Sequence, residues 1–258
     1  MRNRCKLLAM ALTRIDNFLP VIDRESNAVL FAGERQRTMR TVVFATQKGG
    51  SGKSTLAIGL AVAAMGYGHR VVIIETDQQG TVSNWGRRRT STEPHIDCVG
   101  NSVEIEQRLY VLKRDGFTLS VIDTPATNNV LSASAIGTGD MCLIPARPSP
   151  TDIEAALPTL GIVRKLGKPF AFILNQAPAR GCRQSEAAAA LNAAGLLALP
   201  YIVQRNDHQD ALGAGFGVTE FAPDGKAAVE TLALWRWVWQ KLTVRSIDYQ
   251  HAPIRATG

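Results

Sequence analysis

Residues 44–55, with the sequence FATQKGGSGKST, constrain the fold more than any other part of this chain. They follow the apolar residues 41–45 and precede the small, apolar residues 56–64. This order predicts a buried strand, a glycine-rich turn and a helix. Glycines in such a turn let backbone N–H groups converge on phosphate oxygens, and the helix N-terminus adds a favourable partial charge. We therefore interpret the segment as a phosphate-binding loop.

Individual side chains of the loop have predictable roles. Lys53 is expected to reach the β- and γ-phosphates of a nucleotide, and the Ser54 hydroxyl is expected to ligate Mg²⁺. The usual pattern has glycine where this chain has Gln47, and a second lysine, Lys48, comes directly after it. The expected nucleotide-binding run is Lys48, Gly49, Gly50, Ser51, Gly52, Lys53, Ser54 and Thr55.

The sequence KGGSGKST, with its early lysine, resembles the deviant Walker A loop of the ParA/MinD superfamily. In that superfamily the early lysine crosses a dimer interface and contacts the partner's nucleotide. The resemblance implies this role for Lys48, and it implies a homodimer that forms with ATP. It also implies that Lys48 and Lys53 are both catalytic.

Apolar runs alternate with helical stretches along the rest of the chain. Strands are expected at residues 70–74, 118–122, 141–145, 169–174 and 200–203, and helices at 152–166, 185–194 and 226–242. This alternation predicts an α/β fold in which helices cover both faces of a mostly parallel, twisted sheet. Together with the phosphate loop, it predicts a single-domain P-loop NTPase fold.

The expected domain boundaries follow from the same reading. Residues 39–245 form the ParA-type ATPase domain, and the resemblance covers about four fifths of the chain. Residues 1–38 are either a weakly ordered extension or an upstream start that the native protein does not use, and residues 246–258 are expected to be a flexible tail. Residues 1–38 are too short and unpatterned for the helix-turn-helix domain of longer partition proteins, so self-repression is not expected.

Composition narrows the function only slightly. The net charge of +7 permits salt-sensitive binding to nucleic acid or an anionic membrane without proving either. The four cysteines, Cys5, Cys98, Cys142 and Cys182, have no metal-ligand spacing, which favours a reduced, cytosolic protein. The basic, apolar start of the chain is too short for a convincing export signal, and no apolar run approaches the length of a membrane span.

Polar residues directly follow several of the predicted strands. Ligands of open α/β sheets bind at these carboxyl ends. Asp123 matches a Walker B aspartate that holds Mg²⁺ through a water molecule. Asp77 resembles the family's carboxylate that orients the attacking water, whereas Glu75 stands where the family has Asp, so a metal role does not transfer to it. Asn175 resembles the family's adenine-contacting asparagine, with a turn-forming asparagine as the alternative.

Basic side chains suggest a second binding surface, one that would contact the phosphates of DNA. Arg87–Arg89 form a cluster that is either a solvated helix end or a phosphate-contacting patch. Arg183 and Arg205 are further candidates because they resemble basic positions that ParA relatives use on DNA. Such contacts would be independent of sequence and weakened by salt.

A tryptophan-rich helix near residues 234–242 raises a membrane alternative. Leu232, Trp235, Trp239 and Leu242 share one helical face, which favours core packing over a membrane helix. Trp237 is expected to point the opposite way, toward a dimer or partner contact.

The resemblance implies an ATP-hydrolysing switch that binds DNA non-specifically and positions a plasmid, a chromosome region or a protein cluster. A ParB-like or cargo adaptor protein is expected to stimulate hydrolysis, and the protein is expected in the cytoplasm, on the nucleoid. The alternatives are a MinD-like membrane-cycling regulator and, ranked below it, an ATP-dependent cofactor-synthesis enzyme.

Overall fold

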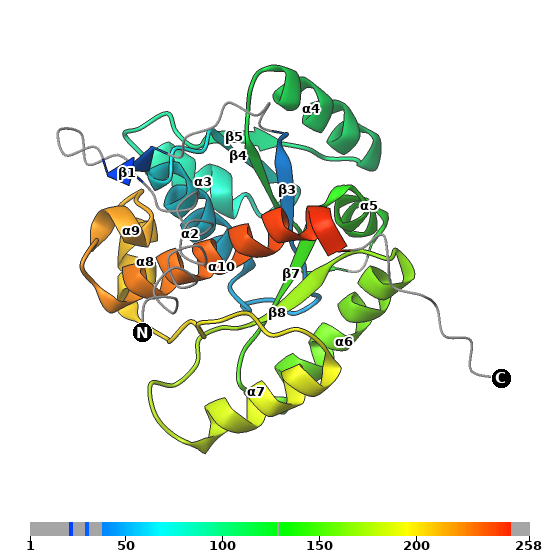
Figure 1. Cartoon of the computed structure of the whole chain (residues 1–258), viewed down its shortest axis with the longest axis vertical. Helices are drawn as coiled ribbons and strands as arrows, with labels where there is room; N and C mark the ends of the chain where they lie inside the picture. The colour runs from blue at the N-terminus through cyan, green and yellow to red at the C-terminus, as the bar shows by residue number, and fades with distance from the viewer. Residues whose placement is uncertain (1–20, 23–28, 31–37, 128, 249–258) are drawn as a thin grey trace, which may run out of the picture. The chain divides into compact units, whose positions relative to one another are not determined.

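A computed structural model describes residues 21–22, 29–30, 38–127 and 129–248 (Figure 1). The chain divides into two units, Met1–Arg37 and Thr38–Gly258. In the first unit, β1 (Val21–Ile22) pairs antiparallel with β2 (Val29–Leu30). The rest of the predicted extension at 1–38, apart from Thr38, lies outside the described residues, as do residues 249–258 of the tail predicted at 246–258. Residues 246–248 of that tail belong to a helix that ends at Asp248.

A six-stranded parallel sheet forms the centre of the second unit, with the strand order β5-β4-β6-β3-β7-β8. Three central strands are buried along their length because helices cover both faces, which is why they consist mostly of apolar residues. The strands are β3 (Arg40–Phe44), β4 (Val71–Glu75), β5 (His95–Cys98), β6 (Leu119–Asp123), β7 (Met141–Ala146) and β8 (Phe170–Leu174).

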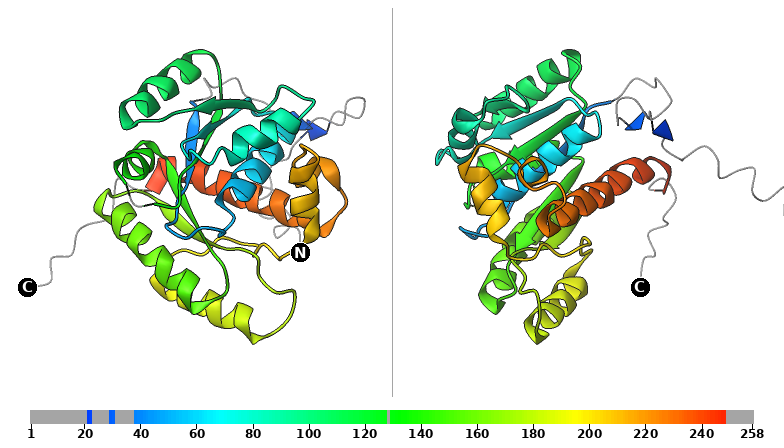
Figure 2. Two further views of the ribbon diagram at one scale, coloured as in Figure 1. Left: turned by 180° about the vertical axis from the view of Figure 1, so that it is seen from behind. Right: turned by 90° about the vertical axis from the view of Figure 1, so that its left-hand side faces the viewer.

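Helices lie on both faces of this sheet (Figure 2). An apolar core fills the space between the sheet and the helices on each face. One face packs against α2, α3 and α10, with Phe44 and Trp235 in its core. The other packs against α4 to α7, with Val43 and Phe172 in its core. The helices are α2 (Lys53–Gly66), α3 (Thr81–Arg88), α4 (Ser102–Arg114), α5 (Val130–Thr138), α6 (Pro150–Lys165), α7 (Cys182–Ala194), α8 (Asn206–Gly213), α9 (Val218–Phe221) and α10 (Lys226–Asp248).

The predicted α/β fold is confirmed, with differences at its margins. The strand predicted at residues 200–203 is wrong, because only Val203 makes an isolated bridge, to Ala177. Pro200 has no N–H to donate to a strand ladder, which limits pairing there. The short edge strand β5 was not predicted.

The parallel arrangement brings the candidate site together. Glu75 and Asp123 are paired in register at the carboxyl ends of β4 and β6, and Phe44 is paired with Asp123 from the other side. The loop after β3 therefore begins beside both acidic residues, at the edge of the sheet where ligands bind.

Candidate nucleotide and magnesium site

The phosphate loop joins β3 to the buried helix α2. Gly50 and Gly52 have φ angles of +74° and +91°, a region that residues with a side chain rarely adopt. A Cβ atom at Gly52 would also lie 2.2 Å from the Nδ2 atom of Asn175. Gly52 caps the N-terminus of α2 without a side-chain hydrogen bond, so the first N–H groups of α2 stay available for an anion.

Lys53 is the first residue of α2 and is buried against the loop. Its Nζ atom donates a hydrogen bond to the carbonyl oxygen of Lys48 at 3.4 Å. Burial lowers the pKa of Lys53, while the charges of Asp123 and Asp77 oppose that change. The ammonium group is thus held inside the turn, between the loop backbone and two carboxylates.

Asp123 is fully buried at the end of β6. Burial raises the pKa of Asp123 to about 7, and the charges of Glu75 and Asp77 add to this, whereas Ser54 and Lys53 act in the opposite direction. The Ser54 hydroxyl is close enough to lower the pKa, although neither carboxylate oxygen has a hydrogen-bond partner of good geometry. A buried carboxylate without partners is costly unless a cation joins it.

Unpartnered buried polar atoms gather around the loop. They include Thr46 Oγ1, Gln47 Nε2, Ser51 Oγ and both carboxylate oxygens of Asp123. Such atoms are uncommon in folded proteins, and bound ligands or water account for many of them. The donors suit phosphate oxygens, and the oxygens of Ser54 and Asp123 suit Mg²⁺. The residues therefore fit Mg²⁺ and a nucleotide.

The described residues contain no group of three or more His, Cys, Asp or Glu side chains that could hold a metal ion. This fits Mg²⁺, which proteins usually bind through one or two carboxylates together with the substrate's phosphates rather than in a complete protein cage.

Asp77 lies in the half-buried loop after β4. Its Oδ1 atom accepts a hydrogen bond from the Gln79 N–H at 3.0 Å. The preceding residue, Thr76, donates to the carbonyl oxygen of Asp123 through its N–H at 3.0 Å and its hydroxyl at 2.9 Å. These bonds place Asp77 close enough to Asp123 and Lys53 for its charge to affect the pKa of both.

Asn175 follows β8 and is buried beside the phosphate loop. Its Nδ2 atom donates to the carbonyl oxygen of Ser51 at 2.8 Å, and the Gln176 side chain donates to that of Gly50 at 3.1 Å. The two amides hold the loop from one side. The predicted adenine contact of Asn175 stays a prediction, and the structure adds this supporting role.

Glu75 does not face the loop as a free carboxylate. Its Oε1 atom accepts from the Val82 N–H at 2.6 Å, and its Oε2 atom accepts from the N–H of Ser83 at 3.0 Å and from the Ser83 hydroxyl. Both oxygens are therefore engaged by the N-terminus of α3. No local sequence pattern predicts this cap, because Glu75 reaches α3 only through the path of the folded loop.

Two of the arginine candidates for DNA binding are engaged in ion pairs. Arg89 donates to both carboxylate oxygens of Glu220, at 2.7 and 2.6 Å, and to the carbonyl oxygen of Gly215 at 3.1 Å, and its side chain is only 4% exposed. Arg205 pairs with Glu230 at 2.5 Å. Because the Arg89 side chain is itself buried and is held by a bidentate ion pair, Arg89 is unsuited to a phosphate contact.

The remaining arginine candidates are exposed. Arg87 hydrogen-bonds only to its helix neighbour Asn84 among the described side chains, and Arg88 donates to the carbonyl oxygen of Leu212 at 3.2 Å. Arg183 lies exposed near the start of α7. The three consecutive arginines are therefore not one uniform patch, since Arg89 faces inward.

The tryptophan-rich helix α10 is a core helix, as predicted. Trp235 is buried, and the Trp239 ring lies 5.4 Å from it and 4.3 Å from the His69 ring. The prediction for Trp237 is wrong, because this side chain is half-buried and packs on the same core, with Lys241 Nζ 5.5 Å from its ring centre. No helix in the described ranges has the length and apolarity to cross a membrane.

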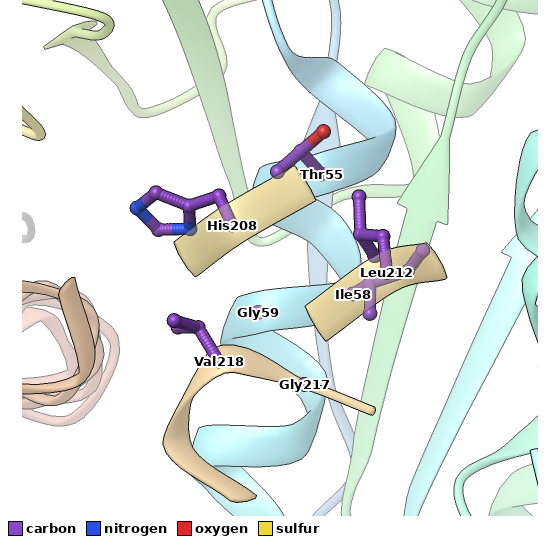
Figure 3. Close-up of a pocket in the computed structure, with 7 residues that line it drawn as sticks. All are labelled: Thr55, Ile58, Gly59, His208, Leu212, Gly217 and Val218. Carbon is purple, nitrogen blue, oxygen red and sulfur yellow. The ribbon is translucent and has the colours of Figure 1, made fainter. Parts of the chain in front are cut away.

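A small pocket lies where α8 and α9 meet α2 (Figure 3). His208, which no sequence motif singled out, lines this pocket, and its Nε2 atom is buried without a hydrogen-bond partner. Burial lowers the pKa of His208, against the opposing charges of Glu230 and Asp207. The residues lining the pocket are Thr55, Ile58, Gly59, His208, Leu212, Gly217 and Val218.

Replacing Asp123 with asparagine is expected to stabilise the chain free of metal and nucleotide, most strongly at high pH. The folded-state pKa of Asp123 lies above its ordinary value, so its stabilising proton is present at low pH and is lost as the pH rises through about 7. Removing the buried charge should recover up to about 4 kcal/mol at pH 8 and little near pH 4. Urea unfolding in EDTA across this range tests the expectation, and an equal effect at both ends would contradict it.

Comparison with known proteins places this geometry in a family. Residues 42–215 match the model of the CobQ/CobB/MinD/ParA nucleotide binding domain. The maintenance of carboxysome distribution protein A of Gloeobacter kilaueensis is 29% identical over 211 residues, which cover 79% of this chain and 94% of that protein. The chromosome partitioning protein ParA of Caulobacter vibrioides is 31% identical over 148 residues, which cover 42% of this chain and 55% of that protein.

A solved structure agrees with the fold. The ATP complex of a McdA variant from Cyanothece superimposes with a TM-score of 0.65 at 20% identity, covering 78% of this chain and 97% of that one. The family model spans more than half of the sequence and includes the phosphate loop, Asp77, Asp123 and Asn175. The predicted resemblance to the ParA/MinD superfamily is thereby confirmed, and the chain belongs to the CobQ/CobB/MinD/ParA nucleotide-binding domain family.

Proposed function

We propose that this chain is a ParA-type ATPase that hydrolyses ATP to ADP and phosphate and uses the cycle to position a cargo. The proposal rests on one observation. Lys53, Asp123 and Asp77 lie together at one phosphate loop, close enough for their charges to shift the pKa values of Lys53 and Asp123. Family membership supports the same reading.

The side chains around the phosphate loop have separate roles in the proposed hydrolysis. Lys53 and the N-terminus of α2 bind the β- and γ-phosphates, and Ser54 and Asp123 would hold Mg²⁺, with Asp123 acting through a water molecule. When bound, Mg²⁺ neutralises charge that develops on the phosphate oxygens. Asp77 orients the attacking water from the loop after β4. Catalysis is mainly electrostatic, because the donors and charges are fixed before the reaction.

Lys48 completes the site in a dimer. It is half-buried, and its charge contributes to lowering the pKa of Asp152 at the start of α6. We infer that ATP bridges two copies of this chain and that Lys48 of each copy contacts the nucleotide of the other. Hydrolysis then separates the copies, and an adaptor protein of the ParB type, or one carried by the cargo, accelerates this step.

The ATP-bound dimer binds DNA non-specifically in this proposal, on the nucleoid in the cytoplasm. A plasmid, a chromosome region or a protein cluster are possible cargoes, and the names of the two relatives, for carboxysome distribution and chromosome partitioning, span two of these classes. A MinD-like membrane cycle is the less favoured alternative, because the tryptophans of α10 are packed in the core. A cofactor-synthesis enzyme is less favoured still, because the two relatives named above are distribution and partitioning proteins.

DNA binding is expected to depend on nucleotide and on salt. Dimerisation doubles the basic surface that faces one duplex, and each phosphate contact releases counterions. Protein loaded with ATP should retard unrelated DNA fragments equally, protein loaded with ADP should not, and added salt should abolish the shift. Electrophoretic mobility assays measure all three.

Matched variants sharpen this test. The exposed residues Arg87 and Arg183 are the candidates for replacement by alanine. If one of them contacts a DNA phosphate, its loss should reduce the steepness of the plot of log binding constant against log salt concentration by about 1. Arg108→Ala is the control, because Arg108 on α4 is paired with Asp97 of β5. Binding that persists with ADP would contradict the proposal, and ATP-dependent vesicle binding without DNA binding would favour the MinD-like alternative.

A further inference from the structure

Helix α3 begins without a capping side chain of its own. The residue before its first turn is Gly80, which has a φ angle of +66° and forms no side-chain cap. Its first N–H groups would otherwise lack partners inside the helix. Glu75, the last residue of β4, supplies them instead, and this side chain is only 3% exposed. A negative carboxylate at a helix N-terminus is also favoured by the helix dipole.

This cap closes the short segment between β4 and α3 into a ring. Inside the ring, Asp77 accepts from the N–H of Gln79 through its side chain at 3.0 Å and from the N–H of Gly80 through its carbonyl at 3.1 Å. Thr76 fixes the other side by donating to the carbonyl oxygen of Asp123. The position of the Asp77 carboxylate therefore depends on the hydrogen bonds that Glu75 accepts from the first turn of α3.

We propose that Glu75 is a positioning residue that holds the Asp77 loop in place for hydrolysis by capping α3, rather than a ligand of Mg²⁺. Both of its oxygens accept hydrogen bonds from Val82 and Ser83, so neither is directed to a metal. The proposal rests on the proposed ATPase function and assigns Glu75 a part in it. The length of the side chain matters, because one carboxylate must reach two successive N–H groups.

The other end of α3 is anchored independently. The Trp85 Nε1 atom donates to the carbonyl oxygen of Phe216 at 3.1 Å, and Arg89, directly after the helix, pairs with Glu220. Trp85 itself is fully buried. Weakening the Glu75 cap should therefore loosen the first turn of α3 and the Asp77 loop without releasing the helix, so the variants are expected to fold.

The test compares Glu75→Asp and Glu75→Gln with the wild type. Glu75→Asp is one methylene shorter and cannot hold both N–H groups, whereas Glu75→Gln keeps the length and one acceptor oxygen. In Glu75→Asp we expect amide exchange at Val82 and Ser83, measured without nucleotide, to be about tenfold faster. Single-turnover ATP hydrolysis should be about 10- to 100-fold slower. Glu75→Gln should lie between Glu75→Asp and the wild type in both.

Two further measurements separate positioning from metal binding. The Kd of ATP, by calorimetry, and the Mg²⁺ concentration for half-maximal hydrolysis should stay within about twofold of the wild type. Glu104→Gln is the matched control, since Glu104 also accepts a backbone N–H, from Gly100, at the start of a different helix, α4. It should leave hydrolysis and the exchange at Val82 unchanged.

Three outcomes would overturn the proposal. Unchanged exchange together with a raised Mg²⁺ requirement would make Glu75 a metal ligand. Faster exchange with unchanged hydrolysis would make the cap merely structural, and unchanged exchange with unchanged hydrolysis would remove both roles. If the wild type itself hydrolysed no ATP, the ATPase function would fail, while the exchange measurement would still show whether Glu75 holds the Asp77 loop.

Discussion

Lys53→Ala is expected to abolish ATP binding that calorimetry can detect. The Lys53 ammonium is buried beneath the phosphate loop and is the basic group that faces Asp123 and Asp77 there. Without it, the phosphates of ATP would meet two acidic side chains in a partly desolvated site. Loss of a charged partner in such a setting costs several kcal/mol, so the Kd should rise by at least about a hundredfold.

Lys48→Ala is the matched variant, because it removes a second lysine from the same loop. Lys48 is half-buried, and only its backbone carbonyl is bonded to Lys53. The variant should therefore keep its affinity for ATP and lose hydrolysis, since the missing charge acts across the dimer. Wild-type affinity in Lys53→Ala would remove the phosphate-loop assignment, and unchanged turnover in Lys48→Ala would remove the role in trans.

The central fold could be predicted because its signals are local. Strands β3, β4, β6 and β7 are short apolar runs followed by polar residues, and burial on both faces produces that pattern. Strand β5, with the sequence HIDC, lies at the edge of the sheet, where its residues are exposed or half-buried. It has neither an apolar run nor a clear alternation, so periodicity could not identify it.

The same distinction holds for the site. Lys53, Ser54 and Asp123 belong to local motifs whose strand, turn and helix can be read from neighbouring residues. In contrast, Arg89 and Glu220 are 131 residues apart, and their pairing is visible only in the folded chain. Reading Arg87–Arg89 as one basic cluster overlooked that tertiary contact. The absence of a metal role for Glu75 stays a prediction, and its cap could not be predicted because it depends on the path of the loop.

Asp77→Ala is expected to trap an ATP-bound dimer. Asp77 is half-buried, and its loop is held by Thr76, Gln79 and Glu75 rather than by contacts of its own carboxylate with the phosphate loop. Its removal deletes the bond from the Gln79 N–H but leaves the phosphate loop held by Asn175 and Gln176, so ATP still binds. Hydrolysis should fall about 100-fold or more, as is typical when a group that activates the nucleophile is lost.

Size-exclusion chromatography with ATP and Mg²⁺ measures this expectation directly. The wild type should return to monomer as ATP is consumed, whereas Asp77→Ala should remain at the dimer position for much longer. Asp115→Ala, which removes an exposed aspartate after α4, should behave like the wild type. In the proposed cycle, ATP bridges the two copies before hydrolysis separates them, so a block in hydrolysis should prolong the dimer. A variant that hydrolyses ATP rapidly, or one that binds ATP and stays monomeric, would contradict the role of Asp77 and the proposed order of assembly before hydrolysis.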